Sequence, residues 1–133
     1  MKPTVLDASA LLAMLFGEPG MEEMRTLFHK AANADKPLLI AAVNWAEVLN
    51  RVSRRQGATG REAAKVLASS GAIEIVAVDA ILAEAAATYK ASDQLGLADA
   101  FAAALAKSRK AELVTADLEF KSVEKEIKIL WLK

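Results

Sequence analysis

The feature that most constrains this fold is the alternation of short aliphatic runs with longer helical patterns. Runs rich in Val, Ile and Leu predict strands at residues 4–6, 38–41, 73–78, 112–115 and 127–132. Apolar periodicity and capping residues predict helices at residues 8–16, 21–32, 44–56, 59–71, 80–91 and 97–110. Strands that are separated by helices form parallel sheets with both faces covered. We therefore expect an α/β fold with a mainly parallel central sheet.

The composition favours one domain in a reducing compartment. The chain has 133 residues, 54% of them hydrophobic, which suits one well-buried core, so we expect residues 1–133 to form a single domain. Lys plus Arg equals Asp plus Glu at 17 each, so an anionic substrate would need a local basic patch or a bound cation. There is no Cys, and the apolar stretch at residues 8–16 is too short to span a membrane. These properties predict a cytoplasmic protein without a membrane segment.

Two acidic residues follow strands at the edge where α/β proteins bind ligands. Asp7 comes directly after the first strand, and Asp117 comes two residues after the fourth. Ligands of open parallel sheets bind beyond the carboxyl ends of the strands, so both carboxylates are candidates for a functional site. Each could instead be an ordinary helix cap or turn residue. Ser9 could equally cap the first helix and leave Asp7 free.

Glu47 shares the flank of an amphipathic helix with Arg51 and Arg54. One interpretation is a solvated face in which Glu47 pairs with Arg51, four residues further on. The alternative is a carboxylate with basic groups that face a phosphate.

Asp99 interrupts the apolar run LGLADAFAAALA. Its neighbours three and four residues away are Gly, Leu and Ala, so its own helix offers no cation to pair with it. Burying an unpaired carboxylate costs several kcal/mol or forces it to protonate. Asp99 is therefore either the N-cap of its helix or a partner of groups from elsewhere in the fold.

Four acids brought to one site would repel one another. At an effective dielectric constant near 20, two like charges about 4 Å apart repel by roughly 4 kcal/mol, and a divalent cation reverses that sign. Carboxylate donors, the absence of Cys and the placement of His29 in a separate helix indicate Mg²⁺ or Mn²⁺ rather than zinc.

These residues occur in segments that resemble the PIN-domain ribonucleases, specifically the VapC-type toxins of toxin–antitoxin pairs. The segments follow the order of the family over nearly the whole chain: VLDASALLAMLFGEPG, NWAEVLNRV, LGLADAFAAALAK, LVTADLEF and IKILWL. The resemblance implies a Rossmann-like, three-layer α/β/α sandwich that cleaves RNA endonucleolytically with a metal ion. The acidic quartet of the family falls on Asp7, Glu47, Asp99 and Asp117.

The resemblance also implies roles for these residues. Asp7 and Asp99 would bind Mg²⁺, for which Mn²⁺ could substitute, and Asp117 would be a direct or water-mediated ligand. Glu47 would orient or deprotonate the attacking water, although spacing alone leaves open which acid is the base. Thr115 matches a hydroxyl residue that is often found near the site.

The expected partners are RNA and protein. The basic runs at residues 51–55, which include Arg51 and Arg54, and at 107–110 could follow an RNA backbone, or could be solvated cations at helix C-termini. The toxins of this family form homodimers and are silenced by a cognate antitoxin, so the resemblance implies both interactions here.

Two other classes of function stay open from the sequence. In a receiver-like or phosphatase-like phosphoacceptor protein, Asp79 at the end of the third strand would be the nucleophile, but Glu47 and Asp99 would then be unexplained. A noncatalytic PIN-like interaction module would retain the fold without the activity.

Overall fold

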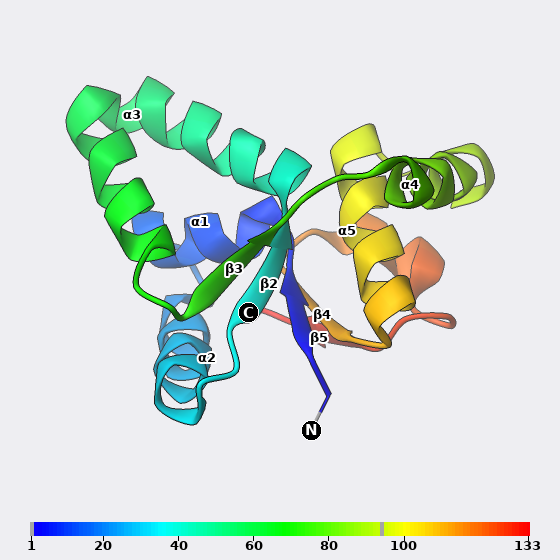
Figure 1. Cartoon of the computed structure of the whole chain (residues 1–133), viewed down its shortest axis with the longest axis horizontal. Coiled ribbons are helices and arrows are strands. Elements are labelled where there is room, and N and C mark those ends of the chain that lie inside the picture. Colours follow the sequence, from blue (N-terminus) through cyan, green and yellow to red (C-terminus); the bar gives the residue numbers. More distant parts are fainter. Residues whose placement is uncertain (1, 94) are drawn as a thin grey trace.

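The computed structural model describes residues 2–93 and 95–133 and contains a five-stranded sheet in the order β3-β2-β1-β4-β5 (Figure 1). The strands are β1 (Thr4–Leu6), β2 (Leu38–Ala41), β3 (Ile73–Val76), β4 (Glu112–Thr115) and β5 (Ile129–Trp131). Every neighbouring pair is parallel, and Val5 in the central strand pairs with Leu39 on one side and Leu113 on the other. The expected parallel sheet is confirmed.

The helices lie close to their predicted ranges. They are α1 (Ala8–Phe16), α2 (Met21–Ala34), α3 (Ala42–Ala68), α4 (Ala80–Asp93), α5 (Leu97–Arg109) and the 3₁₀ helix η1 (Leu118–Val123). The predicted break at Gly57 is a kink inside α3, where Gly57 has φ 69° and ψ −159°. A positive φ of this kind favours glycine. Because the backbone of Gly57 is not helical, the two helices predicted at residues 44–56 and 59–71 are confirmed, and they form the two arms of α3 (Figure 1).

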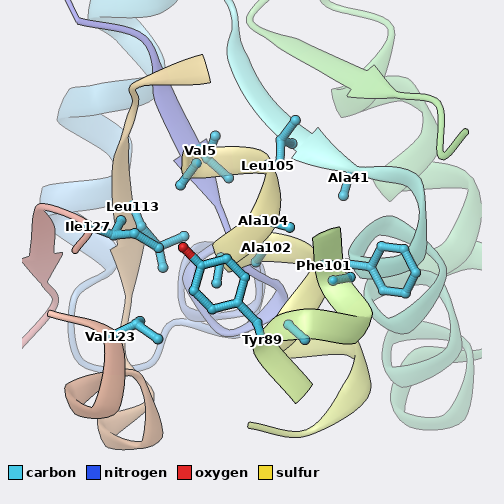
Figure 2. Packing of buried hydrophobic residues seen from close by; sticks show 14 of the residues in the cluster. Val5, Ala41, Tyr89, Phe101, Ala102, Ala104, Leu105, Leu113, Val123 and Ile127 are labelled. Carbon is cyan, nitrogen blue, oxygen red and sulfur yellow. The ribbon is translucent and has the colours of Figure 1, made fainter. Parts of the chain in front are cut away.

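Successive residues of the strands face opposite layers of helices. Leu6, Ile40 and Val114 pack with residues of α1, α2 and α3. Val5 and Leu113 face the other way and pack with residues of α4, α5 and η1, including Tyr89 (Figure 2). Both faces of the sheet are covered, and the three-layer α/β/α sandwich is confirmed.

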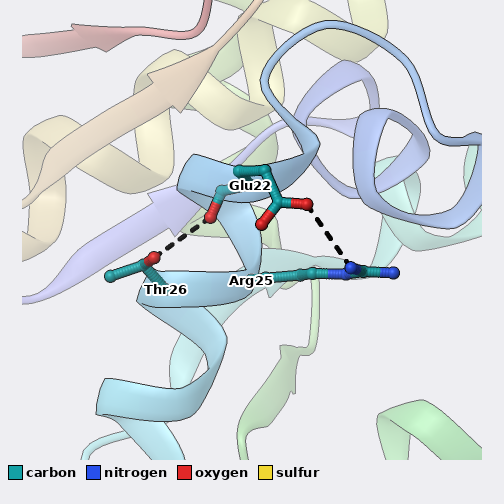
Figure 3. Close-up of polar contacts among 3 residues, drawn as sticks. All are labelled: Glu22, Arg25 and Thr26. Atoms are coloured by element: carbon teal, nitrogen blue, oxygen red, sulfur yellow. Dashed lines mark hydrogen bonds and ion pairs between the residues drawn. The ribbon is translucent and has the colours of Figure 1, made fainter.

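The outer face of α2 is polar and solvated. Arg25 Nη1 lies 3.4 Å from Glu22 Oε1, and Thr26 Oγ1 donates to the Glu22 carbonyl oxygen at 3.1 Å (Figure 3). Both partners of the ion pair are exposed, and such pairs contribute little to stability. The contribution of α2 comes instead from its inner face, where Met24 is fully buried.

Helix α5 is buried along most of its length. Residues 100–106 are all buried, and they lie between α4, α3 and the sheet. Five of these residues are alanines, which allow the neighbouring backbones to approach closely. Asp99 directly precedes this buried run.

The chain order of the strands reverses between β1 and β4. From β1 the chain continues to β2 and β3 on one side of the sheet, and it later returns to β4 and β5 on the other. Ligands of doubly wound α/β proteins bind beyond the carboxyl ends of the strands at such a switch point. Asp7 and Asp117 follow these two strands. Within the described residues, no helix is long and apolar enough to cross a bilayer.

Candidate active site

Asp7 lies at the carboxyl end of β1 and caps α1. Its side chain is only 2% exposed, and its Oδ1 accepts a hydrogen bond from the backbone N–H of Ala10 at 3.0 Å. The interpretation of Asp7 as a helix cap is therefore right, and Ser9 does not take that place. A carboxylate can accept about four hydrogen bonds, so capping leaves Asp7 with further capacity.

Two hydroxyl groups hold the Asp7 carboxylate and connect it to the end of β4. Thr115 Oγ1 donates to Asp7 Oδ2 at 2.7 Å, and Ser9 Oγ donates to Asp7 Oδ1 at 2.8 Å. The same hydroxyls accept from the turn after β4: Thr115 Oγ1 from the N–H of Asp117 at 2.9 Å, and Ser9 Oγ from that of Ala116 at 3.0 Å. The two chain segments that carry Asp7 and Asp117 are thus joined by a closed hydrogen-bond network.

Asp117 begins η1 and is partly exposed. Its Oδ1 accepts a hydrogen bond from the N–H of Glu119 at 2.9 Å, so Asp117 also acts as a cap. The cap interpretation therefore applies to Asp117 as well as to Asp7. In both cases the cap uses one oxygen of the carboxylate and fixes its direction.

Asp99 is half-buried in the first turn of α5. The N-cap of that helix is Gly96, so the alternative in which Asp99 is the N-cap is wrong. Burial, and after it the nearby charges of Asp117, Asp7, Glu47 and Glu119 in that order of size, together raise the pKa of Asp99 from 3.8 to about 7. The other three predicted acids are therefore within electrostatic reach of Asp99.

The pKa of Asp7 is raised for a similar reason. Burial and, to a smaller extent, the charge of Asp117 raise this pKa, which is about 6 in the folded protein against an ordinary value of 3.8. The hydrogen bonds from Thr115, Ala10 and Ser9 lower it and so limit the rise. A raised carboxyl pKa is typical of a site that lacks a counter-charge.

Glu47 lies half-buried on α3. The predicted pair with Arg51 does not form among the described residues, and Glu47 makes no hydrogen bond to them. Arg51 and Arg54 are exposed on the same helix. The interpretation as an ordinary surface ion pair is therefore wrong, and no described residue uses the capacity of the Glu47 carboxylate to accept hydrogen bonds.

Helix N-termini partly offset the negative charge of the cluster. The N-caps of α3 and α5 are Ala41 and Gly96, and neither helix has a side-chain cap among the described residues. The uncapped N–H groups and the helix dipole favour nearby anions by about 0.3–1 kcal/mol each at exposed sites. Such an effect is too small to neutralise several carboxylates.

One member of the cluster was missed by the sequence reasoning. Among the described residues, the carboxylates that could share a metal ion are those of Asp99, Asp117 and Glu119, whose ligand atoms lie within 4.8 Å of one another. The sequence signal was that Glu119 follows Asp117 by two residues. The turn of η1 brings the carboxylate of Glu119 close to that of Asp117. Asp7 lies outside this group of three, and its two carboxylate oxygens accept hydrogen bonds from Ser9 and Thr115.

The donor set fits a hard divalent cation. All the clustered side chains offer carboxylate oxygens, the chain has no Cys, and His29 is exposed on α2. Carboxylate oxygens are the donors that Mg²⁺, Mn²⁺ and Ca²⁺ prefer. The raised pKa values of Asp7 and Asp99 show that the carboxylates would gain from such a counter-charge.

Other predicted groups lie apart from the cluster. The basic run at residues 107–110 is at the opposite end of α5 from Asp99, and eight residues of helix separate Asp99 from Lys107 by about 12 Å. Asp79, the nucleophile of the phosphoacceptor alternative, is exposed, and its Oδ1 caps α4 by accepting from the N–H of Leu82 at 2.8 Å.

Comparison with known families decides the classification. The model of the PIN domain matches residues 4–126. The chain belongs to the PIN domain family. Comparison with curated protein sequences gave no match. The phosphoacceptor alternative loses its support, because the acids that it left unexplained are those that this PIN domain gathers.

Solved structures agree with this PIN domain in fold. VapBC2 from Rickettsia felis, bound to a DNA fragment from its promoter, aligns with a TM-score of 0.79 at 16% identity and covers 98% of both chains. DNA-bound VapBC from Salmonella typhimurium aligns with a TM-score of 0.75 at 21% identity, again over 98% of both chains. VapC20 from Mycobacterium tuberculosis, a toxin that cleaves the sarcin–ricin loop, aligns with a TM-score of 0.73 at 20% identity and covers 90% of this chain and 94% of its own.

Proposed function

We propose that this PIN domain is a metal-dependent endoribonuclease that acts as the VapC-type toxin of a toxin–antitoxin pair. The observation that supports the proposal is the cluster of carboxylates of Asp99, Asp117 and Glu119, with Asp7 and Glu47 near enough to raise the pKa of Asp99. Membership of the PIN family and the likeness in fold to VapC20, which cleaves RNA, support the same activity.

In this proposal Asp99, Asp117 and Asp7 hold Mg²⁺ or Mn²⁺, and Glu119 adds a fourth carboxylate. The bound cation supplies charge that stabilises the phosphodiester during attack and acidifies a bound water. Ser9 and Thr115 keep Asp7 oriented and, through their hydrogen bonds, favour its charged form. The chain itself thus provides a preorganised set of oxygen donors.

Glu47 is the proposed general base. Its carboxylate is half-buried and makes no hydrogen bond to a described residue, so it is free to take a proton from water. Arg51 and Arg54 lie one and two turns further along the same exposed flank, and we assign them to binding of the RNA backbone.

The proposed partners are a cognate antitoxin and a second copy of the chain. Structures of VapBC from Rickettsia felis and Salmonella typhimurium are complexes of the toxin–antitoxin type. The proposed place of action is the cytoplasm, where RNA is present and a chain without Cys needs no oxidising environment.

Cleavage of RNA by the purified chain tests the activity. Transfer RNA and a ribosomal fragment that contains the sarcin–ricin loop are incubated with protein in Mg²⁺, in Mn²⁺ and in EDTA. We expect cleavage with metal, none with EDTA, and loss of cleavage in Glu47→Gln. Glu62→Gln on the outer arm of α3 is the matched control, because within the described part of the chain Glu62 makes only an exposed ion pair with Lys65. Equal cleavage by Glu47→Gln and Glu62→Gln would refute the role of Glu47.

A further inference from the structure

A buried amide connects the two helices that carry Glu47 and Asp99. Asn44 lies in the first turn of α3, one turn before Glu47, and is fully buried. Its Nδ2 donates a hydrogen bond to the backbone carbonyl oxygen of Ala98 at 2.9 Å. Ala98 is the residue that directly precedes Asp99 in the first turn of α5.

The orientation of this amide follows from its partner. A carbonyl oxygen only accepts hydrogen bonds, so the Asn44 atom that faces the Ala98 oxygen must be the NH₂ group. The other end, Asn44 Oδ1, is buried and has no hydrogen-bond partner among the described residues. A buried acceptor without a partner is unfavourable, so packing alone does not explain a buried amide at this position.

Apolar contacts restrict the relative position of α3 and α5 less than the hydrogen bond from Asn44 does. The first turn of α5 leads into a helix of small alanines, which can slide against a neighbour without a large change in buried area. A hydrogen bond is directional and restricts both the distance and the rotation of its partners. The bond from Asn44 therefore fixes α3 against α5 one residue before Asp99 and one turn before Glu47.

We infer that Asn44 is a positioning residue that holds the Glu47 carboxylate of α3 and the Asp99 carboxylate of α5 at a fixed separation. The inference rests on the proposed function, because it assigns the bond a role in placing the proton acceptor relative to the metal-binding acids. Displacement of catalytic groups by about 1 Å can slow a reaction roughly a hundredfold. Asn44 touches neither substrate nor metal in this account.

The test separates a role in positioning from a role in stability. Asn44→Leu removes the hydrogen bond and also the orphaned acceptor, and it keeps the number and branching of the side-chain heavy atoms. We expect its urea midpoint to stay equal to or above that of the wild type, while kcat for RNA falls about tenfold to a hundredfold with KM within about twofold. Ser53→Ala is the matched control, because Ser53 Oγ is the other buried side-chain atom without a partner among the described residues and lies on the same helix. It is expected to keep wild-type kcat.

Mn²⁺ affinity, measured by calorimetry without RNA, gives a readout apart from activity. Asn44→Leu is expected to bind Mn²⁺ about fivefold or more weakly than the wild type, since Asp99 is no longer held in place. If Asn44→Leu unfolds, Asn44→Ala is measured in the same assays, with the same expected losses of kcat and of Mn²⁺ affinity. Wild-type kcat and Mn²⁺ affinity in a folded Asn44 variant would overturn the inference and leave the proposed function intact. A wild-type chain that neither cuts RNA nor binds Mn²⁺ would instead overturn the proposed function, and the inference with it.

Discussion

Replacing Asp99 by Asn should stabilise the metal-free protein at neutral and alkaline pH. Asp99 has a pKa raised from 3.8 to about 7 by burial and neighbouring acids. For an acid whose pKa is raised by folding, the stability present below the unfolded pKa is lost as the pH rises through the folded pKa. The wild type therefore loses stability between about pH 4 and pH 7, and an uncharged Asn does not.

The size of the effect follows from the same pKa. The difference between 3.8 and about 7 corresponds to roughly 4 kcal/mol for a fully desolvated group. Asp99 is only half-buried, and solvent screening reduces this figure to about 1–2 kcal/mol. The loss of a negative charge in the first turn of α5 works against the gain by about 0.3–1 kcal/mol. A net stabilisation near 1 kcal/mol is expected above pH 7.

Urea unfolding in EDTA from pH 4 to pH 8 measures this effect. The gain from Asp99→Asn should be near zero at pH 4, grow through pH 6 and level off above pH 7. Asp79→Asn is the control for net charge, because Asp79 is an exposed cap of α4 outside the cluster. A stabilisation that does not change with pH, or a loss of stability at pH 8, would refute the electrostatic reasoning. Excess Mg²⁺ should reverse the order of wild type and variant, because it stabilises the form that binds it.

The hydroxyl network gives the remaining predictions. Thr115→Val keeps the shape of a fully buried side chain but removes the donor to Asp7 and the acceptor for the N–H of Asp117, so the free energy of unfolding at pH 8 should fall by about 1–3 kcal/mol. Ser9→Ala removes a partly exposed hydroxyl and should lower it by less, about 1 kcal/mol. Urea unfolding checks both, and a Thr115→Val protein as stable as the wild type would contradict the structural role of the network.

Much of the arrangement was predictable because a parallel sheet brings the carboxyl ends of its strands to one edge. Asp7 and Asp117 follow strands that are neighbours in the sheet, so their convergence required only the strand order. The break between the two arms of α3 was predictable from Gly57, whose backbone is not helical. The direction of the second arm depends on its packing, where Gly60 and Ala64 are buried, and local residues do not encode it.

Other features depended on contacts between distant segments. The helix predicted at residues 97–110 already placed Asp99 in the first turn of α5, but the sequence could not indicate which acids from distant segments would lie near it. The place of Glu119 in the cluster follows from the turn of η1, and the bond from Asn44 to Ala98 joins residues 54 positions apart. An ion pair between Glu47 and Arg51 is expected of an isolated helix. In the folded chain, Glu47 also lies near acids from other segments, which local sequence does not indicate.

The central claim is that the acids at the switch point form one divalent cation site, and direct binding of Mn²⁺ tests it. Calorimetric titrations at pH 8 and pH 6 compare the wild type with Asp99→Asn and Asp79→Asn. Because the raised pKa values of Asp7 and Asp99 mean that protons compete with the ion, the affinity of the wild type should fall as the pH is lowered to 6. Asp79→Asn should bind like the wild type, and Asp99→Asn about tenfold or more weakly, a loss of roughly 1.4 kcal/mol. Absence of binding to the wild type at pH 8, or equal binding by Asp99→Asn, would contradict the account.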